Sequence, residues 1–308
     1  MCLERSERNG HTYESIRRAD QKPVPWYPEQ LPRFSEEDDA HLEYDFAAPE
    51  FEELRSAYNL DNIAGNGTAS ERAERLLHYF APRLKHESFY DNHVECSAMK
   101  LLTYSFENDE HGINCLNKAK ILAECCLALG IFARRVFIHP FSPFDFDSHV
   151  VCEIFDEQRG KWIMLDPTTD GYFVNEDNEP LSMYEIRTNY LNSEFLTLVS
   201  ADDKDADLRK AAEKNESINL YFLKNCFRIS FETYNGFGER KGSVCLVPEH
   251  YPVCRNEELN HRFRVENMPE EYRYLLDAQE KYLEKTNHTE EPTAYSVRSV
   301  YAAPERKS

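Results

Sequence analysis

The sequence predicts an α+β fold in which a helix packs on an antiparallel β-sheet. Three observations support this prediction. Apolar residues between positions 116 and 127 recur at alternating spacings of three and four, as one buried helical face requires. Two short runs rich in β-branched and aromatic residues, 149–155 and 161–166, follow this helix. Further helical patterns precede it and supply helices that can pack on the sheet.

The helix contains Cys115 in its first turn and ends before Gly130. Glycine favours a helix end because it adopts the left-handed conformation that follows the last turn. The first turn of a helix has unpaired N–H groups and the positive end of the helix dipole, and both favour a thiolate. Because the thiolate is the nucleophilic form of cysteine, Cys115 is a candidate nucleophile.

The two strand-like runs predict a β-hairpin. Residues 156–160 between them are polar and contain a glycine, and Pro167 follows the second strand, where it ends the hydrogen-bond ladder. A hairpin of this kind brings its first and last residues to the same end of the sheet.

The residues at those two ends are His149 and Asp166. They lie directly opposite each other if Phe155 pairs with Gly160, which leaves a four-residue loop. A five-residue loop would offset them by one position, and a β-bulge would then have to correct the offset. The sequence therefore places an imidazole and a carboxylate side by side.

Cys115, His149 and Asp166 have the chemistry of a nucleophile, a base and an orienting carboxylate. A thiol needs a nearby base, and His149 would take its proton and later protonate the leaving group. Asp166 would accept the imidazole N–H, fix the tautomer and stabilise the imidazolium. This order, with cysteine on a helix and histidine and aspartate on strands, is that of papain-like cysteine enzymes.

Three motifs in this order resemble the transglutaminase-like superfamily, as found in bacterial transglutaminase-like domain proteins. The motifs are Asn114-Cys115 through Ala128-Leu129-Gly130-Ile131-Phe132-Ala133-Arg134, then Ser148-His149-Val150, then Trp162-Ile163-Met164-Leu165-Asp166-Pro167-Thr168. The match is close over about sixty residues and loose over 50–200. The resemblance implies a papain-like core and catalysis by a Cys–His–Asp triad. The family's aromatic residue after the histidine is replaced by Val150-Val151, and the usual glycine before the cysteine is displaced to Gly112.

The domain organisation that follows has four parts. We expect an extended N-terminal arm over 1–40, a transglutaminase-like catalytic core over 41–200, an extension of the sheet plus a helix over 201–287, and a disordered tail over 288–308. The elements expected outside the triad segment are helices starting near 51, at 70–80 with a Ser70 cap, at 95–105 and from 269 to about 283, a helix or loop at 184–195, a strand or a helix-to-strand passage at 219–231, and a strand at 243–247.

Composition limits the possible partners. The formal net charge is −20 and the isoelectric point is near 5.0, which argues against nucleic acid and anionic membranes as partners. Residues 1–8 contain no apolar core, so we expect no secretory signal, and because no apolar run of eighteen residues occurs in the sequence we expect no membrane span. Nine cysteines, mostly in apolar contexts, favour reduced thiols in the cytoplasm over a disulfide framework.

Some features of the site remain open in the sequence. The Cys115 N–H is one oxyanion donor by position, while Tyr79, His86, Tyr104 and Asn114 are equal candidates for the second. The aromatic loop 139–147 either lines a substrate cleft or packs locally on the body. No C-x-x-C pair occurs, so we expect no structural zinc, and we expect no cofactor.

The function predicted from the sequence is thiol-dependent acyl chemistry at amide bonds of peptides or proteins. Cys115 forms a thioester, which water or an amine resolves. Water gives peptidase or deamidase activity, which we favour, and a lysine amine gives protein transamidation. A non-enzymatic binding module that retains the fold is the alternative of a different class. The sequence does not indicate the oligomeric state.

Overall fold

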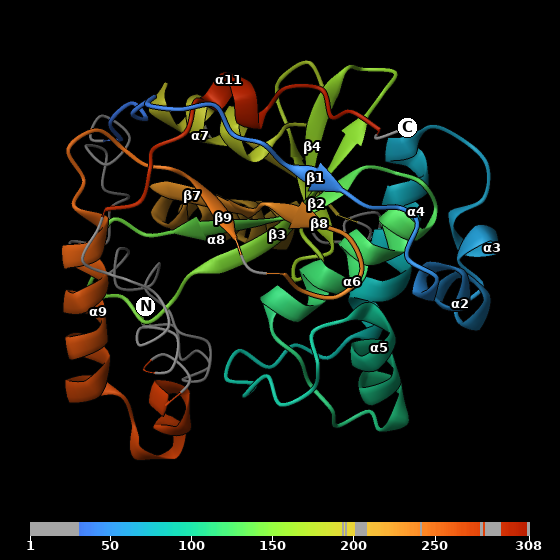
Figure 1. The fold of residues 1–308 in the computed structure, drawn as a ribbon, viewed down its shortest axis with the longest axis horizontal. Coiled ribbons are helices and arrows are strands. Elements are labelled where there is room, and N and C mark those ends of the chain that lie inside the picture. The colour runs from blue at the N-terminus through green and yellow to red at the C-terminus, as the bar shows by residue number, and fades with distance from the viewer. Residues whose placement is uncertain are drawn as a thin grey trace.

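The centre of the molecule is a five-stranded antiparallel β-sheet with the strand order β4-β3-β2-β7-β9 (Figure 1). The coordinates are a computed structural model, which describes residues 31–192, 194, 196–200, 208–240, 242–277, 280 and 291–306. Helices surround the sheet, so the α+β class predicted from the sequence is confirmed.

The strands fall into one large and two small sheets. The large sheet contains β2 (Ala133–His139), β3 (His149–Asp156), β4 (Lys161–Leu165), β7 (Arg228–Glu232) and β9 (Ser243–Leu246). The small sheets pair β1 (Glu43–Tyr44) with β8 (Tyr234–Asn235) and β5 (Gly171–Val174) with β6 (Thr197–Ser200).

The helices differ in length from one turn to five. They are α2 (Glu50–Ala57), α3 (Leu60–Ala64), α4 (Ala69–Phe80), α5 (Ala98–Glu107), α6 (Cys115–Ala128), α7 (Met183–Leu191), α8 (Leu208–Asn225), α9 (Val253–Asn267) and α11 (Val297–Val300). Short 3₁₀ turns lie at Ala81–Arg83 and Glu270–Tyr272. In Figure 1, α9 lies at one end of the long axis, and α2 and α3 lie at the other.

Helices cover both faces of the large sheet. On one face, α4 and α6 pack against β3, where Cys125 and Cys126 of α6 share a buried cluster with Cys152 and Ile154. On the other face, Phe222 of α8 is buried in a second cluster with apolar residues of β2, β3, β7 and β9. Because successive residues of a strand point to opposite faces, one sheet supplies both clusters.

The predicted helix with Cys115 in its first turn is confirmed as α6. Asn114 caps it, since its side-chain oxygen accepts a hydrogen bond from the backbone N–H of Asn117 at 3.3 Å. At the other end Gly130 has a φ of 76°, and the N–H of Ile131 donates to the carbonyl of Cys126 at 2.9 Å. This is the left-handed glycine end that the sequence predicts.

Two sequence predictions about element ends and tails need correction. The cap of α4 is Thr68 and not Ser70, because Thr68 and Glu71 form a reciprocal capping box. The tail predicted to be disordered is packed over 291–306, where Ala294 and Val300 are 3% and 1% exposed. The backbone of this segment pairs with residues around Asp38 and with β9. These backbone contacts and the two buried side chains hold the segment on the body of the protein.

The outer regions agree with the sequence in part. Residues 31–40 of the predicted arm are extended along β9 and the C-terminal segment, and the rest of the arm lies outside the described residues, as does the acidic stretch 201–207. Of the two possibilities for 219–231, the structure has the helix-to-strand passage, with the end of α8 followed by β7, and the strand at 243–247 is confirmed as β9. The long C-terminal helix is α9, which the sequence did not indicate because α9 has one buried residue and no apolar stripe.

Candidate active site

Cys115 is the first residue of α6 and lies at a partly exposed position. The chain reaches it through a run that pairs in parallel with the segment around His86, where His86 and Ile113 form a β-bridge. Gly112 makes this approach possible, since a Cβ there would lie 2.6 Å from the Cβ of Glu87. Gly112 therefore has a steric role three residues before Cys115.

His149 and Asp166 are in contact, as the sequence predicts. The imidazole Nε2 of His149 and the Oδ2 of Asp166 are 3.1 Å apart, and the two residues are 2% and 0% exposed. His149 is the first residue of β3, and Asp166 directly follows β4.

The register of this hairpin differs by two positions from the one that would place His149 and Asp166 directly opposite each other. Phe155 pairs with Trp162 and not with Gly160, because the four-residue loop is 157–160. Residues two apart on a strand share a face, so the change keeps His149 and Asp166 on the same face. They meet diagonally instead of directly across the ladder.

The turn after β4 fixes the Asp166 carboxylate. Its Oδ1 accepts a hydrogen bond from the N–H of Thr168, and its Oδ2 accepts one from the hydroxyl of Thr169, both at 2.9 Å. The backbone of Asp166 pairs with Gly171 at the start of β5. Although burial opposes ionisation, His149 and these two threonines hold the pKa of Asp166 below its ordinary value.

The imidazole of His149 also interacts with Cys115. Burial alone would lower the pKa of His149, but the charge and hydrogen bond of Asp166, followed by the hydrogen bond and charge of Cys115, raise it to about 10. Because Nε2 faces Asp166, we assign the interaction with the thiol to the remaining ring nitrogen. The three residues selected from the sequence therefore come together, with histidine between the sulfur and the carboxylate.

Aromatic residues of α8 cover the imidazole. The rings of Tyr221 and Phe222 lie 5.2 and 5.6 Å from the ring of His149, measured between centroids, with edge-on geometry. Tyr221 hydrogen-bonds Asp147, and Lys224 lies 3.7 Å from the same carboxylate. Sequence reasoning missed these residues, because α8 follows the triad by about fifty residues and nothing in its pattern indicates which side chain faces His149.

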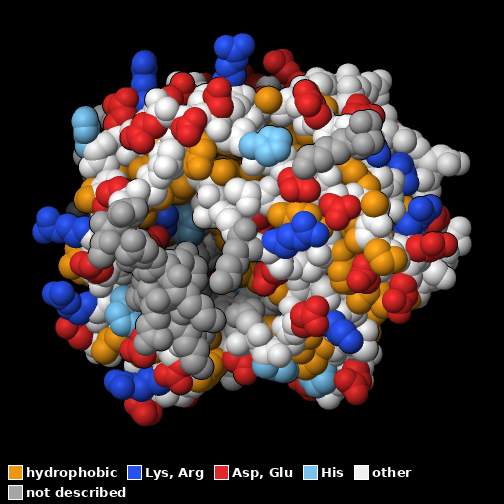
Figure 2. Space-filling view, viewed as in Figure 1, with side chains coloured by type: hydrophobic (Ala, Val, Ile, Leu, Met, Phe, Trp, Pro, Cys, Tyr) orange, Lys and Arg blue, Asp and Glu red, His pale blue; other side chains and the backbone are white. Residues whose placement is uncertain are grey.

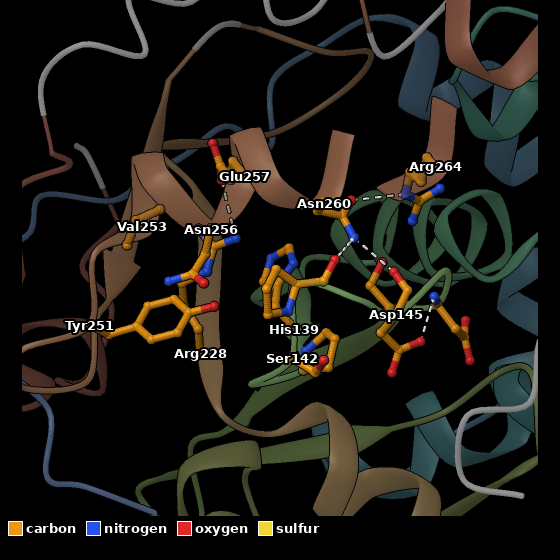
Figure 3. A pocket seen from close by; sticks show the side chains of 14 residues that line it. His139, Ser142, Asp145, Arg228, Tyr251, Val253, Asn256, Glu257, Asn260 and Arg264 are labelled. Carbon is orange, nitrogen blue, oxygen red and sulfur yellow. Dashed lines mark hydrogen bonds and ion pairs between the residues drawn. The ribbon is translucent and has the colours of Figure 1, made fainter. Parts of the chain in front are cut away.

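The loop before His149 is fixed by α9. Asn260 of α9 donates hydrogen bonds to the carbonyls of Pro143 and Asp145 at 2.8 and 2.7 Å, and Arg264 donates to the carbonyl of Phe146 at 2.6 Å. Figure 3 shows the polar pocket between α9, this loop and Arg228. The hydrogen bonds around this pocket hold the loop in place.

The aromatic residues of the same loop pack locally. Phe141 contacts Phe227, and Phe144 and Phe146 contact Phe263 of α9. Of the two interpretations that the sequence left open, local packing is the one with contacts to support it.

The four candidates for the second oxyanion donor differ in their surroundings. Tyr79 carries the guanidinium of Arg83 on its ring, and Tyr104 is stacked on His111. Asn114 donates to Asn92 while it caps α6.

His86 is the candidate that faces the triad. Its Nε2 lies 3.1 Å from the Ser88 hydroxyl, while its Nδ1 is buried without a partner in the described part of the chain. Burial, followed by the charges of Lys118 and His149, lowers the pKa of His86 to about 4. His86 is therefore neutral at neutral pH, and one of its nitrogens carries a proton to donate.

Other reactive groups lie away from solvent. Cys125 and Cys126 are fully buried, and burial raises the pKa of both thiols. Across the described ranges, no group of three or more His, Cys, Asp or Glu residues is arranged to hold a metal ion. None of the helices described is long and apolar enough to cross a membrane.

Comparisons with protein-family models, with curated proteins and with solved structures found no match to this chain. The resemblance to the transglutaminase-like superfamily therefore stays a prediction from its motifs.

Proposed function

We propose that this protein is a cysteine-dependent enzyme with a papain-like core that carries out acyl chemistry at amide bonds of peptides or proteins. The observation that carries the proposal is the buried pair of His149 and Asp166, whose imidazole also interacts with the partly exposed thiol of Cys115 at a helix start. An exposed nucleophile next to a buried base is the arrangement that acyl transfer requires.

The reaction follows from the roles of the three residues. The Cys115 sulfur attacks the carbonyl carbon, and the proton of the thiol is held on His149. The N–H of Cys115 stabilises the oxyanion, and His149 then gives its proton to the leaving amine as the C–N bond breaks. Water, activated by the same imidazole, hydrolyses the thioester and regenerates the thiol. We favour hydrolysis, by a peptidase or a deamidase, over transfer to a lysine amine.

The partly exposed position of Cys115 favours the enzyme over a binding module, because a retained but inactive fold has no need to keep its sulfur accessible. The buried Cys125 and Cys126 give an internal comparison within the same helix.

The test is the pH dependence of iodoacetamide labelling at Cys115, measured by peptide mass spectrometry. We expect labelling to persist well below the ordinary thiol pKa of about 8.5 and to be lost in His149→Ala. Asp166→Asn should slow labelling less than His149→Ala does. Cys125 and Cys126 should stay unlabelled until the protein unfolds. If Cys115 in the native protein reacts only near pH 8.5, or equally fast in all three proteins, the proposed nucleophile is rejected.

A further inference from the structure

Lys118 is a buried cation one helical turn after Cys115. It is 3% exposed, and residues three apart on a helix lie on the same face, so its side chain leaves α6 on the side of the thiol. With the residues that the structure describes, its ammonium forms neither a hydrogen bond nor an ion pair. A buried charge without a partner opposes folding, so its retention beside the nucleophile calls for a functional reason.

The charge of Lys118 acts on the active site. Its ammonium interacts electrostatically with Asp166, Cys115 and Asp170, in that order of strength. Burial outweighs these three interactions and lowers the pKa of Lys118 to about 8. The side chain is therefore still mostly protonated at pH 7 and carries its positive charge into the site.

Each carboxylate near Lys118 already has a histidine partner. Asp166 pairs with His149 and accepts two further hydrogen bonds. Asp170 pairs with His78 through its Oδ1, at 2.7 Å from the imidazole Nδ1. A thioester sulfur carries no charge, so Cys115 offers Lys118 no anion once the acyl group is attached. During that step Lys118 is left as a cation without an anion of its own.

Other donors without acceptors surround the same position. No described group accepts the backbone N–H of Cys115 or Leu116, as is usual for the first turn of a helix. The Nδ1 of His86 is buried and unpaired, and the charge of Lys118 acts on this ring as well. An ammonium beside two backbone N–H groups that no described residue accepts forms a site for an anion.

The rest of the molecule would not attract an anion. The chain has a formal net charge of −20, and Figure 2 shows acidic side chains spread over the visible face. Because the protein as a whole is negatively charged, it does not attract anions over long distances. A buried cation beside Cys115 would select an anionic substrate only at short range, where the ion pair forms.

We propose that Lys118 binds a carboxylate of the substrate close to the carbonyl carbon that Cys115 attacks. The substrate class is then an amide with a free carboxylate near the scissile bond, such as a peptide at its C-terminal residue or beside an acidic side chain. This inference rests on the proposed function and narrows its substrate.

The test compares two alkylating reagents that differ in charge. Iodoacetate carries a carboxylate next to the reacting carbon, and iodoacetamide carries a neutral amide in the same place. In both, the Cys115 sulfur bonds to the CH₂ carbon and iodide leaves. We expect Lys118→Met to lower the ratio of the iodoacetate rate to the iodoacetamide rate at Cys115 about tenfold or more, because both reagents meet the same thiol and only iodoacetate carries the carboxylate.

Two controls make the result specific. Lys100→Met removes the same charge from an exposed position of α5 and should change neither rate. The melting temperature of Lys118→Met should equal or exceed that of the wild type, because a buried unpaired charge is replaced by an apolar side chain of similar size.

Each other outcome overturns the inference. An unchanged ratio of the two rates shows that Lys118 does not bind the carboxylate. An equal fall in both rates shows that it acts on the thiol and not on the substrate. A lower melting temperature with an unchanged ratio assigns it a structural role. If iodoacetamide labelling of native wild-type Cys115 is slow and independent of His149, the proposed function fails first, and the two failures are thereby distinguished.

Discussion

Two histidine–aspartate pairs share one turn of this protein, and they differ in what the second ring nitrogen of each histidine contacts. Asp166 begins the turn and pairs with His149, and Asp170 ends it and pairs with His78. His78 uses its second nitrogen on Glu74, at 3.5 Å, whereas His149 uses its second nitrogen on the thiol of Cys115.

Electrostatics alone does not separate these pairs. Carboxylates raise the pKa of His78 to about 9, with the Asp170 hydrogen bond as the largest cause, and that of His149 to about 10 against the opposing effect of burial. A raised pKa is therefore not the mark of the active site here. What distinguishes the candidate active site is that the thiol of Cys115 lies near the ring nitrogen of His149 that no carboxylate contacts.

The largest difference between the pairs should appear in stability. We expect Asp166→Asn to lower the free energy of unfolding by about 3 kcal/mol, because it breaks a fully buried pair, and Asp170→Asn to lower it by about 1 kcal/mol, because its partner is half-buried. Asparagine tolerates the left-handed conformation of Asp170, whose φ is 52°, so the two variants are matched. Urea unfolding at pH 7 measures both, and equal losses would contradict the comparison.

The pH dependence of stability should separate the pairs next. Each folded histidine has a pKa above its ordinary value of 6.5, so its pair stabilises the protein fully below pH 6.5. This contribution is lost as the pH rises through about 10 for His149 and about 9 for His78. The wild type should therefore lose more stability than Asp166→Asn between pH 6.5 and 10.

The same comparison applies to the second pair. Asp170→Asn should remove the part of this loss that occurs by about pH 9. Unfolding free energies measured from pH 6 to 10 check both variants, and parallel curves for all three proteins would show that neither pair is protonated as described.

The smallest effect should come from the thiol. Cys115→Ala removes a hydrogen bond and a charge that raise the pKa of His149. This pKa should therefore fall, and the protonation equilibrium of His149 should change by about tenfold. His78 has no contact with the thiol and should titrate as before. NMR titration of the two imidazoles gives both values, and an unchanged His149 would mean that the imidazole and sulfur are not coupled.

Much of the fold was predictable because local rules produce it. The apolar spacing of α6, its end at Gly130 and the two strands of the hairpin follow from periodicity and turn residues that neighbours in sequence supply. The predictions of individual elements failed where two local signals compete or where no local signal exists. Two possible caps lie two residues apart at Thr68 and Ser70, and α9 has no apolar stripe to reveal it.

The sequence by itself determined the three groups of the candidate triad and brought Asp166 to His149. The two residues stay on one face of the sheet even though the register differs by two, because strand side chains repeat every second residue. Tertiary structure alone decided the environment of the triad. Tyr221 covers the imidazole. Among the residues that the structure describes, the Nδ1 of His86 has no hydrogen-bond partner, and the buried ammonium of Lys118 has neither a hydrogen bond nor an ion pair. Burial and the absence of a partner depend on segments distant in the chain, and no local pattern encodes them.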